Sequence, residues 1–328
     1  MKWRIYSVAV VFFLSNSLSV TAQLTAGLTG QRDTSYGNYS AFESTRKTHP
    51  FIKLITEFKN PAVAEEKNIV YGSTGKRDLL TDVFYPKEKN DHKRIAVIMI
   101  HGGGWRTGNR TQHYPLAQKL ASLGYVCITP EYRLSTEALF PAGIYDLKEA
   151  IRWVKNNASK YNIDSSRIVA AGFSAGGELA AFLGVTGNMP LFEGAGKTST
   201  PTNVAAVVDM DGILSFTHPE SGEGDDSKRI SSATYWFGYP KKGNEKLWDA
   251  GSSLSYVSAA APPTLFINSS VDRMHAGRED YIKVLNDHHI YTETHRFADA
   301  PHSFPLFDPW FDPMIGYIDA FLTKIFPR

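Results

Sequence analysis

Cysteine is almost absent from this sequence, in which Cys127 is the only one among 328 residues. A single thiol excludes an intramolecular disulfide, so the fold must depend on its buried core. Cys127 lies inside the apolar run of "YVCITPEYR". Inert packing is therefore expected of this side chain, rather than nucleophilic chemistry.

A large net charge is also missing, because the 35 Lys and Arg residues are nearly balanced by 33 Asp and Glu residues. The sequence has no basic run and no alternation of basic and aromatic residues, which argues against a nucleic-acid partner. It also has no HExxH, CxxC or phosphate-loop signature, so we predict neither a metal nor an organic cofactor.

Long apolar runs are missing except near the N-terminus. There "MKWR" is followed by "IYSVAVVFFLSNSLSV" and by the small-residue site "VTA", the order typical of a signal peptide. The apolar run is too short and interrupted for an anchor, which needs about 20 apolar residues. We predict a signal peptide over residues 1–22, a mature chain from Gln23 and no membrane anchor in that mature form.

Strand-like and helix-like segments alternate from about residue 61 to residue 328. "RIAVIMI" is typical of a buried parallel strand, and "YDLKEAIRWVKNNASKY" of an amphipathic helix. Such alternation predicts one α/β domain with helices on both faces of a mostly parallel sheet. Residues 23–60 are expected to be a loose extension, and residues 212–255 an insertion that forms a lid over the site.

Ser174 lies in "RIVAAGFSAGGELAAFL", a strand-like run followed directly by a helix-like run. This is the order that a nucleophile elbow requires. Gly172 and Gly176 suit it, because the sharp turn brings the backbone too close for a Cβ at either position. The pattern predicts Ser174 as a nucleophile.

A second motif, "HGGGW", follows the strand-like run "AVIMI", with "PEYRLS" and "FPAGIYDLKEAIRWV" between it and Ser174. With these motifs, residues 65–326 resemble the esterase branch of the α/β-hydrolases, and more closely the secreted carbohydrate esterases of polysaccharide-degrading bacteria. The resemblance implies an eight-stranded, mostly parallel sheet and a periplasmic or extracellular location. It also implies an oxyanion hole made by the N–H groups of Gly103, Gly104 and Ala175.

The resemblance implies that the acid and then the base follow the nucleophile along the chain. Both are therefore expected after Ser174. Asp272 follows the strand-like run "TLFIN", and His302 lies in "FADAPHSF" just after another strand. We predict Ser174 as nucleophile, His302 as general base and then acid, and Asp272 as the carboxylate that orients His302.

Other residues could fill the acid and base positions. Asp209 and Asp211 in "VVDMDG" are the next choice for the acid, because some hydrolases carry it after that earlier strand, whereas Asp299 more simply shapes a turn. Four histidines are weaker candidates for the base, because they fall on a helix end, on a strand or beside Asp272. They are His275, His288, His289 and His295.

The substrate suggested by the resemblance is an ester of a plant polysaccharide, with pectin methyl or acetyl esters slightly favoured. Arg106 and Arg273 could pair with uronate carboxylates, although a bracing or surface role is simpler for each. Five aromatic residues could stack on sugars, although ordinary packing is simpler for each: Trp105, Tyr235, Trp236, Trp310 and Phe311. The alternatives are an acetyl xylan or feruloyl esterase, a serine peptidase, or a non-catalytic sugar-binding protein on a decayed hydrolase fold.

Overall fold

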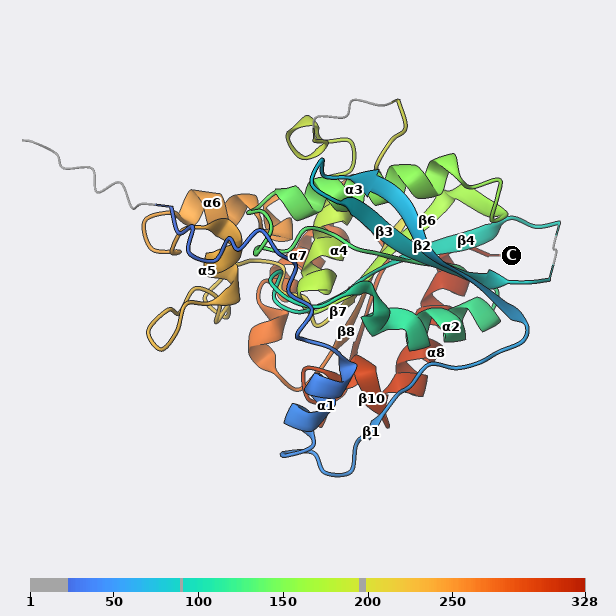
Figure 1. Ribbon diagram of the computed structural model, residues 1–328, viewed down its shortest axis with the longest axis horizontal. Coiled ribbons are helices and arrows are strands. Elements are labelled where there is room, and N and C mark those ends of the chain that lie inside the picture. The colour runs from blue at the N-terminus through green and yellow to red at the C-terminus, as the bar shows by residue number, and fades with distance from the viewer. Residues whose placement is uncertain (1–22, 89–90, 195–198, 328) are drawn as a thin grey trace, which may run out of the picture.

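The computed structural model describes residues 23–88, 91–194 and 199–327 (Figure 1). The predicted signal peptide, residues 1–22, lies outside the described residues. Within them, no helix combines the length and the apolar character that crossing a membrane requires.

An eight-stranded sheet forms the centre of the described chain, in the order β2-β3-β5-β4-β6-β7-β8-β9. Strand β3 is antiparallel to both of its neighbours, and the pairs from β5 to β9 are all parallel. The strands are β2 (Val63–Ser73), β3 (Asp78–Pro86), β4 (Arg94–Ile100), β5 (Val126–Pro130), β6 (Ile163–Phe173), β7 (Ala206–Met210), β8 (Thr264–Asn268) and β9 (Thr292–Arg296).

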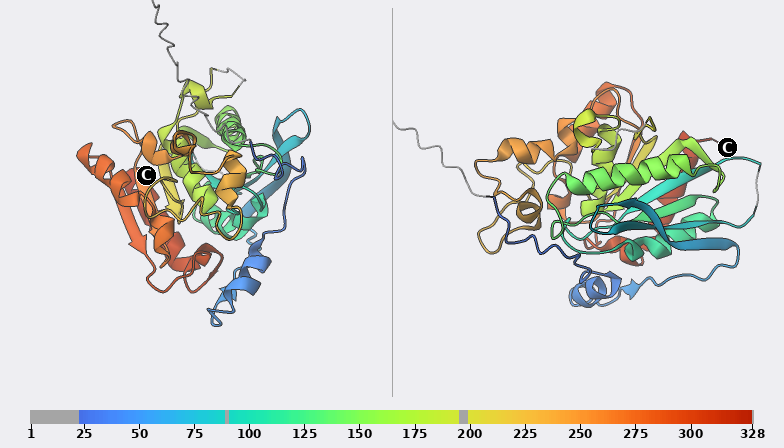
Figure 2. Two further views of the ribbon diagram at one scale, coloured as in Figure 1. Left: turned by 90° about the vertical axis from the view of Figure 1, so that its left-hand side faces the viewer. Right: turned by 45° about the horizontal axis from the view of Figure 1, so that its top comes forward.

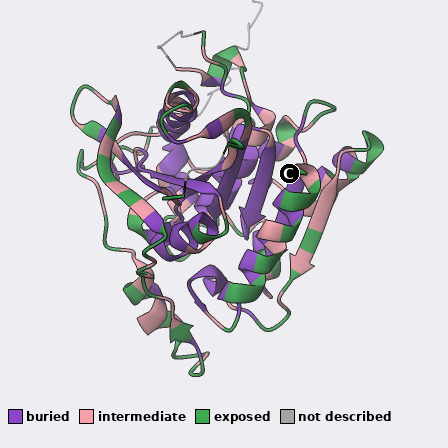
Figure 3. Cartoon of the chain, turned by 90° about the vertical axis from the view of Figure 1, so that its right-hand side faces the viewer, coloured by how far each residue is buried: buried purple, intermediate pink, exposed green. Residues whose placement is uncertain are grey.

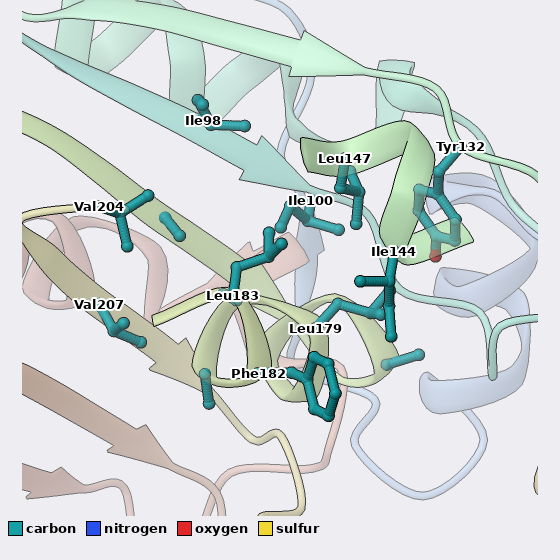
Figure 4. Packing of buried hydrophobic residues seen from close by; sticks show 14 of the residues in the cluster. Ile98, Ile100, Tyr132, Ile144, Leu147, Leu179, Phe182, Leu183, Val204 and Val207 are labelled. Carbon is teal, nitrogen blue, oxygen red and sulfur yellow. The ribbon is translucent and has the colours of Figure 1, made fainter. Parts of the chain in front are cut away.

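Helices cover both faces of this sheet, because alternate side chains of β4 are apolar and point to opposite faces. Ile98 and Ile100 point toward α3 (Ala142–Asn156) and α4 (Ala175–Val185) (Figure 4), and α7 (Arg278–Asp287) contributes to the same buried cluster. Val97 and Met99 point to the opposite face and pack with α2 (Tyr114–Ser122) and α8 (Phe311–Ile325). The central strands are therefore buried on both sides, as Figure 3 shows. Cys127 of β5 is fully buried in the second cluster, as predicted.

The segment of residues 212–255 separates β7 from β8 and projects from one end of the sheet (Figure 1). It contains the short helices α5 (Ser232–Phe237) and α6 (Glu245–Ala250). Phe216, Trp236, Phe237 and Trp248 form its aromatic centre, with neighbouring ring centroids 4.7 to 5.9 Å apart. The segment is thus a packed unit with its own apolar contacts.

The N-terminal segment packs against the domain, so the expectation of a loose extension is wrong. Its helix α1 (Asn38–Thr45) precedes β1 (Lys53–Leu54), which pairs antiparallel with β10 (Phe307–Asp308). Ile52 and Ala41 are buried in the same cluster as α8. The sequence does not reveal this packing, because the apolar residues of the segment follow neither a helical nor a strand periodicity.

Candidate active site

Ser174 occupies the sharp turn between β6 and α4, with φ of 58° and ψ of −124°. A Cβ added to Gly172 would lie 2.0 Å from the carbonyl oxygen of Gly176, and one added to Gly176 would lie 2.0 Å from that of Ile100. Both glycines are therefore required by close backbone approach, as the sequence predicts. The turn places Ser174 in the lining of a pocket.

Ser174, His302 and Asp211 form a continuous hydrogen-bonded chain. The Oγ of Ser174 lies 2.8 Å from Nε2 of His302, and Nδ1 of His302 lies 2.9 Å from Oδ2 of Asp211. Asp211 directly follows β7 and is fully buried. The structure thus brings together two of the three predicted residues and supplies the third from a different strand.

The prediction of Asp272 as the acid is wrong. Its side chain is 84% exposed, and its Oδ1 accepts a hydrogen bond from Arg296 at 2.8 Å. A 3-10 helix (Asp272–His275) follows β8 and turns this carboxylate to solvent. Asp211, which the sequence left as the next choice, takes the position instead. The sequence holds no signal that separates the two, because each aspartate follows a fully buried strand.

The charge on Asp211 is stabilised by its surroundings. Burial alone would raise the pKa of this carboxyl, but interactions with His275 and His302 and the backbone N–H of Ser269 lower it to about 2. Asp211 is therefore ionised at neutral pH. A carboxylate at 2.9 Å favours the His302 tautomer with its proton on Nδ1, which leaves Nε2 to accept the hydroxyl proton of Ser174.

The three predicted oxyanion donors lie next to this chain of residues. Gly103 and Gly104 have φ of 124° and 61°, a conformation that favours glycine. Gly104, Ser174 and Ala175 line the same pocket. Among the described residues, the N–H groups of Gly103, Gly104 and Ala175 donate to no acceptor. They are available to a negatively charged oxygen formed at Ser174.

His101, the first residue of the HGGGW motif, braces the glycine loop. Its ring is buried and stacks on Tyr132 with centroids 4.5 Å apart, and its Nδ1 lies 2.9 Å from the carbonyl oxygen of Gly102. Burial lowers the pKa of His101 to about 3, so the ring is neutral at physiological pH. A buried, neutral imidazole suits a structural role.

Trp105 also braces the loop, and it does not offer a stacking platform to a sugar. Its indole is 4% exposed, stacks on Trp236 at 5.1 Å and donates from Nε1 to Oε2 of Glu178 at 2.9 Å. Trp236, Trp310 and Phe311 are buried as well, while Tyr235 lines the pocket. Glu178 belongs to α4, the helix that begins at the nucleophile turn. The hydrogen bond from Trp105 therefore joins the glycine loop to the helix that follows Ser174.

Glu178→Gln is expected to weaken the pH dependence of stability. Burial raises the pKa of Glu178 well above its usual range, so the folded protein holds a proton that the unfolded chain releases above about pH 4.3. Stability therefore falls as the pH rises from that value towards the folded pKa. Glutamine keeps an oxygen acceptor for Trp105 and removes the titration.

The measurement is the Tm by circular dichroism at pH 5, 6, 7 and 8. The variant should lose less Tm over this range than the native protein. Glu220→Gln, which changes a carboxylate that is 54% exposed, should keep the native slope. An unchanged slope in Glu178→Gln would show that Glu178 is already ionised in the folded protein.

The pocket beside Ser174 and His302 has a volume of about 490 Å³. Residues 212–255, the expected lid, form one of its walls. Their contributions are Ile213, Gly222, Glu223, Asp225, Arg229, Ile230, Ser231, Ser232 and Tyr235. The lining includes three arginines and two carboxylates, so it is strongly polar.

The predicted arginines, Arg106 and Arg273, both line this pocket. The guanidinium of Arg106 lies 4.0 Å from the centre of the Tyr235 ring, and that of Arg273 lies 3.4 Å from Glu223. Burial raises the pKa of Glu223. Arg229 is exposed and forms no hydrogen bond or ion pair within the described chain. Sequence reasoning missed Arg229 and Glu223, which lie in an aperiodic stretch.

Comparison with known sequences finds a matching protein family and related esterases. The model of a protein family described as BD-FAE matches residues 81–277. Esterase LipQ of Mycobacterium tuberculosis is 30% identical over 75% of this chain and 58% of its own length. The probable carboxylic ester hydrolase LipM of the same organism is 29% identical over 78% of this chain and 59% of its own length. The chain therefore spans less than two thirds of these curated relatives.

Comparison with solved structures confirms the fold class. A structure titled as a truncated form of a carbohydrate esterase from gut microbiota superposes with a TM-score of 0.68 at 25% identity, over 82% of this chain and all of that one. The propionate-bound esterase Est2 of Thermogutta terrifontis gives a TM-score of 0.65 at 23% identity, over 81% and 95%. The mostly parallel eight-stranded sheet is that of an α/β-hydrolase.

Proposed function

We propose that this chain, which belongs to the BD-FAE family, is a carboxylic-ester hydrolase with Ser174 as its nucleophile. The observation that carries the proposal is the hydrogen-bonded chain from Ser174 through His302 to the buried Asp211. A serine hydroxyl, an imidazole and an ionised carboxylate in this order beside a pocket are typical of nucleophilic catalysis. Core packing does not require such an arrangement. The similarity to LipQ and LipM supports the same reaction class.

The proposed reaction follows from these positions. His302 accepts the proton of Ser174 while Oγ attacks the ester carbonyl carbon, and Asp211 stabilises the imidazolium that forms. The tetrahedral oxyanion accepts hydrogen bonds from the N–H groups of Gly103, Gly104 and Ala175. His302 then protonates the leaving alcohol. It next removes a proton from a water molecule, which attacks the acyl group and restores the free Ser174.

The proposed substrate is an ester of a plant polysaccharide outside the cytoplasm. Two observations support it: the polar lining of the pocket and the similarity to a carbohydrate esterase from gut microbiota. Pectin is favoured over acetylated or feruloylated xylan, because Arg106, Arg229 and Arg273 could pair with uronate carboxylates next to the ester. The signal peptide predicted over residues 1–22 accords with export to the periplasm or beyond.

The test is release of methanol, acetate and ferulate from methylated pectin, acetylated pectin, acetylated xylan and feruloylated xylan. Hydrolysis of p-nitrophenyl acetate serves as the small-substrate reference. We expect methanol or acetate from pectin, and Ser174→Ala should abolish it. Arg229→Ala, which removes a side chain without a partner in the described chain, should raise KM for pectin several-fold and leave p-nitrophenyl acetate unchanged. Activity on xylan alone would contradict the pectin proposal, and activity retained in Ser174→Ala would contradict the nucleophile.

A further inference from the structure

The N-terminal segment of residues 24–58 runs from α5 to α1 and on to β10 (Figures 1 and 2). It lies outside residues 81–277, which the family model matches. We propose that this segment is a strap that positions both the oxyanion loop, residues 101–108, and the loop that carries His302. This inference rests on the proposed esterase function and adds a positioning element to it.

The first contact of the strap is with the far end of the oxyanion loop. The Thr107 hydroxyl accepts the backbone N–H of Tyr36 at 3.0 Å and donates to Oδ1 of Asp33 at 3.3 Å. The N–H of Gly108 donates to the carbonyl oxygen of Asp33 at 3.0 Å. The Thr107 hydroxyl also lies 3.3 Å from the hydroxyl of Ser35. Two consecutive residues of the loop are therefore bound to the strap by four hydrogen bonds.

Thr107 is coupled directly to the predicted oxyanion donors. Its N–H donates to the carbonyl oxygen of Gly103 at 3.1 Å, so residues 103–107 form a closed turn. A Cβ on Gly103 would lie 2.0 Å from the carbonyl oxygen of Thr107, which shows how little free space the turn has. A displacement of Thr107 would therefore move the N–H groups of Gly103 and Gly104.

A second contact reaches the near end of the same loop. The side-chain amide of Asn38, the first residue of α1, donates to the carbonyl oxygen of Gln112 at 3.1 Å. The Gln112 side chain in turn accepts the N–H of Gly102 at 2.7 Å. The strap thus holds the loop at both ends, at Gly102 through Gln112 and at Thr107 directly.

The third contact holds the chain that follows His302. The hydroxyl of Thr45 lies 2.9 Å from that of Ser303, and the N–H of Ile55 donates to the carbonyl oxygen of Leu306 at 3.0 Å. The pairing of β1 with β10 extends this contact to Asp308. The strap therefore contacts the residue next to the proposed general base.

The strap also touches the pocket wall. The N–H of Leu24 donates to the carbonyl oxygen of Gly238 at 2.6 Å. A Cβ on Gly27 would lie 2.4 Å from the Tyr235 ring and 2.9 Å from a guanidinium nitrogen of Arg106. A single segment therefore contacts the oxyanion loop, the His302 loop and the insertion.

These contacts matter because an oxyanion hole acts through preorganised geometry. Donors must lie about 2.7 to 3.1 Å from the developing oxyanion, and a misplacement of about 1 Å can cost about 10²-fold in rate. Three consecutive glycines, residues 102–104, give this loop little stiffness of its own. External hydrogen bonds from the strap supply the constraint that the loop sequence lacks.

The test uses Thr107→Val in the full-length protein, with kcat and KM for p-nitrophenyl acetate and Tm as readouts. We expect kcat to fall about 10- to 100-fold with KM within about twofold, because the oxyanion exists only in the transition state. Thr107→Ser, which retains the hydroxyl, should restore most of kcat. Thr25→Val, at an exposed threonine of the same segment, should behave as the native protein.

A double-mutant cycle separates positioning from a general loss of stability. Asp33→Ala should lower kcat by itself but add little to Thr107→Val, because both changes break the same contact. If Thr107→Val unfolds, Asp33→Ala and Asn38→Ala provide the comparison. Unchanged kcat in these variants, or a loss that follows Tm alone, would overturn the strap while leaving the esterase proposal intact. A native protein that neither hydrolyses the ester nor reacts with a fluorophosphonate would overturn both.

Discussion

Replacing Asp211 by asparagine is expected to lower kcat by about 10⁴-fold on any ester that the protein hydrolyses. Asparagine has nearly the same shape but no charge, so it cannot stabilise the His302 imidazolium. Its amide can also donate to Nδ1, which favours the tautomer with the proton on Nε2, where His302 can no longer accept the proton of Ser174. The measurement is kcat and KM for p-nitrophenyl acetate, with Tm as the check on folding.

Asp272→Asn is the matched control, because it makes the same chemical change at an exposed carboxylate paired with Arg296. Its kcat should stay within about twofold of the native value, since a surface ion pair contributes at most about 1 kcal/mol to stability. A large loss in Asp272→Asn with a small loss in Asp211→Asn would restore Asp272 as the acid. That result would contradict the arrangement seen in the structure.

Gly103→Ala is expected to lower kcat by about 10²- to 10³-fold, the loss measured when one oxyanion donor is removed in other enzymes. Alanine is strained at a φ of 124°, and its Cβ would lie 2.0 Å from the carbonyl oxygen of Thr107. The loop must therefore open, which moves the N–H groups of Gly103 and Gly104. KM should change much less than kcat, because the oxyanion forms only during the reaction.

Gly75→Ala tests whether backbone strain alone explains such a loss. Gly75 lies in the turn between β2 and β3 with φ of 77°, and no atom lies within 4 Å of its added Cβ. It shares the unfavourable backbone of Gly103 without the clash, so a small decrease in Tm and a native kcat are expected. Equal losses of kcat in both variants would mean that Gly103 acts through overall stability.

The sequence predicted the nucleophile turn because its requirements are local. Gly172, Ser174 and Gly176 lie within five residues, and their spacing follows from the steric limits of one strand-to-helix turn. The base was predictable for a related reason, since His302 is the histidine in the loop that follows the last strand of the sheet. Such features need no knowledge of how distant segments pack.

The acid could not be chosen from the sequence, because both β7 and β8 are followed by aspartates. The choice depends on the 3-10 helix after β8, which turns Asp272 outward, and on the N–H of Ser269, which donates to Asp211. Neither is visible as a motif. The N-terminal strap was missed for a similar reason, because its contacts with the oxyanion loop use backbone groups and short polar side chains rather than an apolar face.

The most direct test of the proposed site is the rate and position of labelling by a fluorophosphonate, measured by intact mass and peptide mapping. We expect one label, located on Ser174, which forms rapidly in the native protein and in Asp272→Asn and much more slowly in Asp211→Asn. It should be absent in Ser174→Ala. Labelling at another residue, or equal rates in Asp211→Asn and the native protein, would contradict the proposed chain of Ser174, His302 and Asp211.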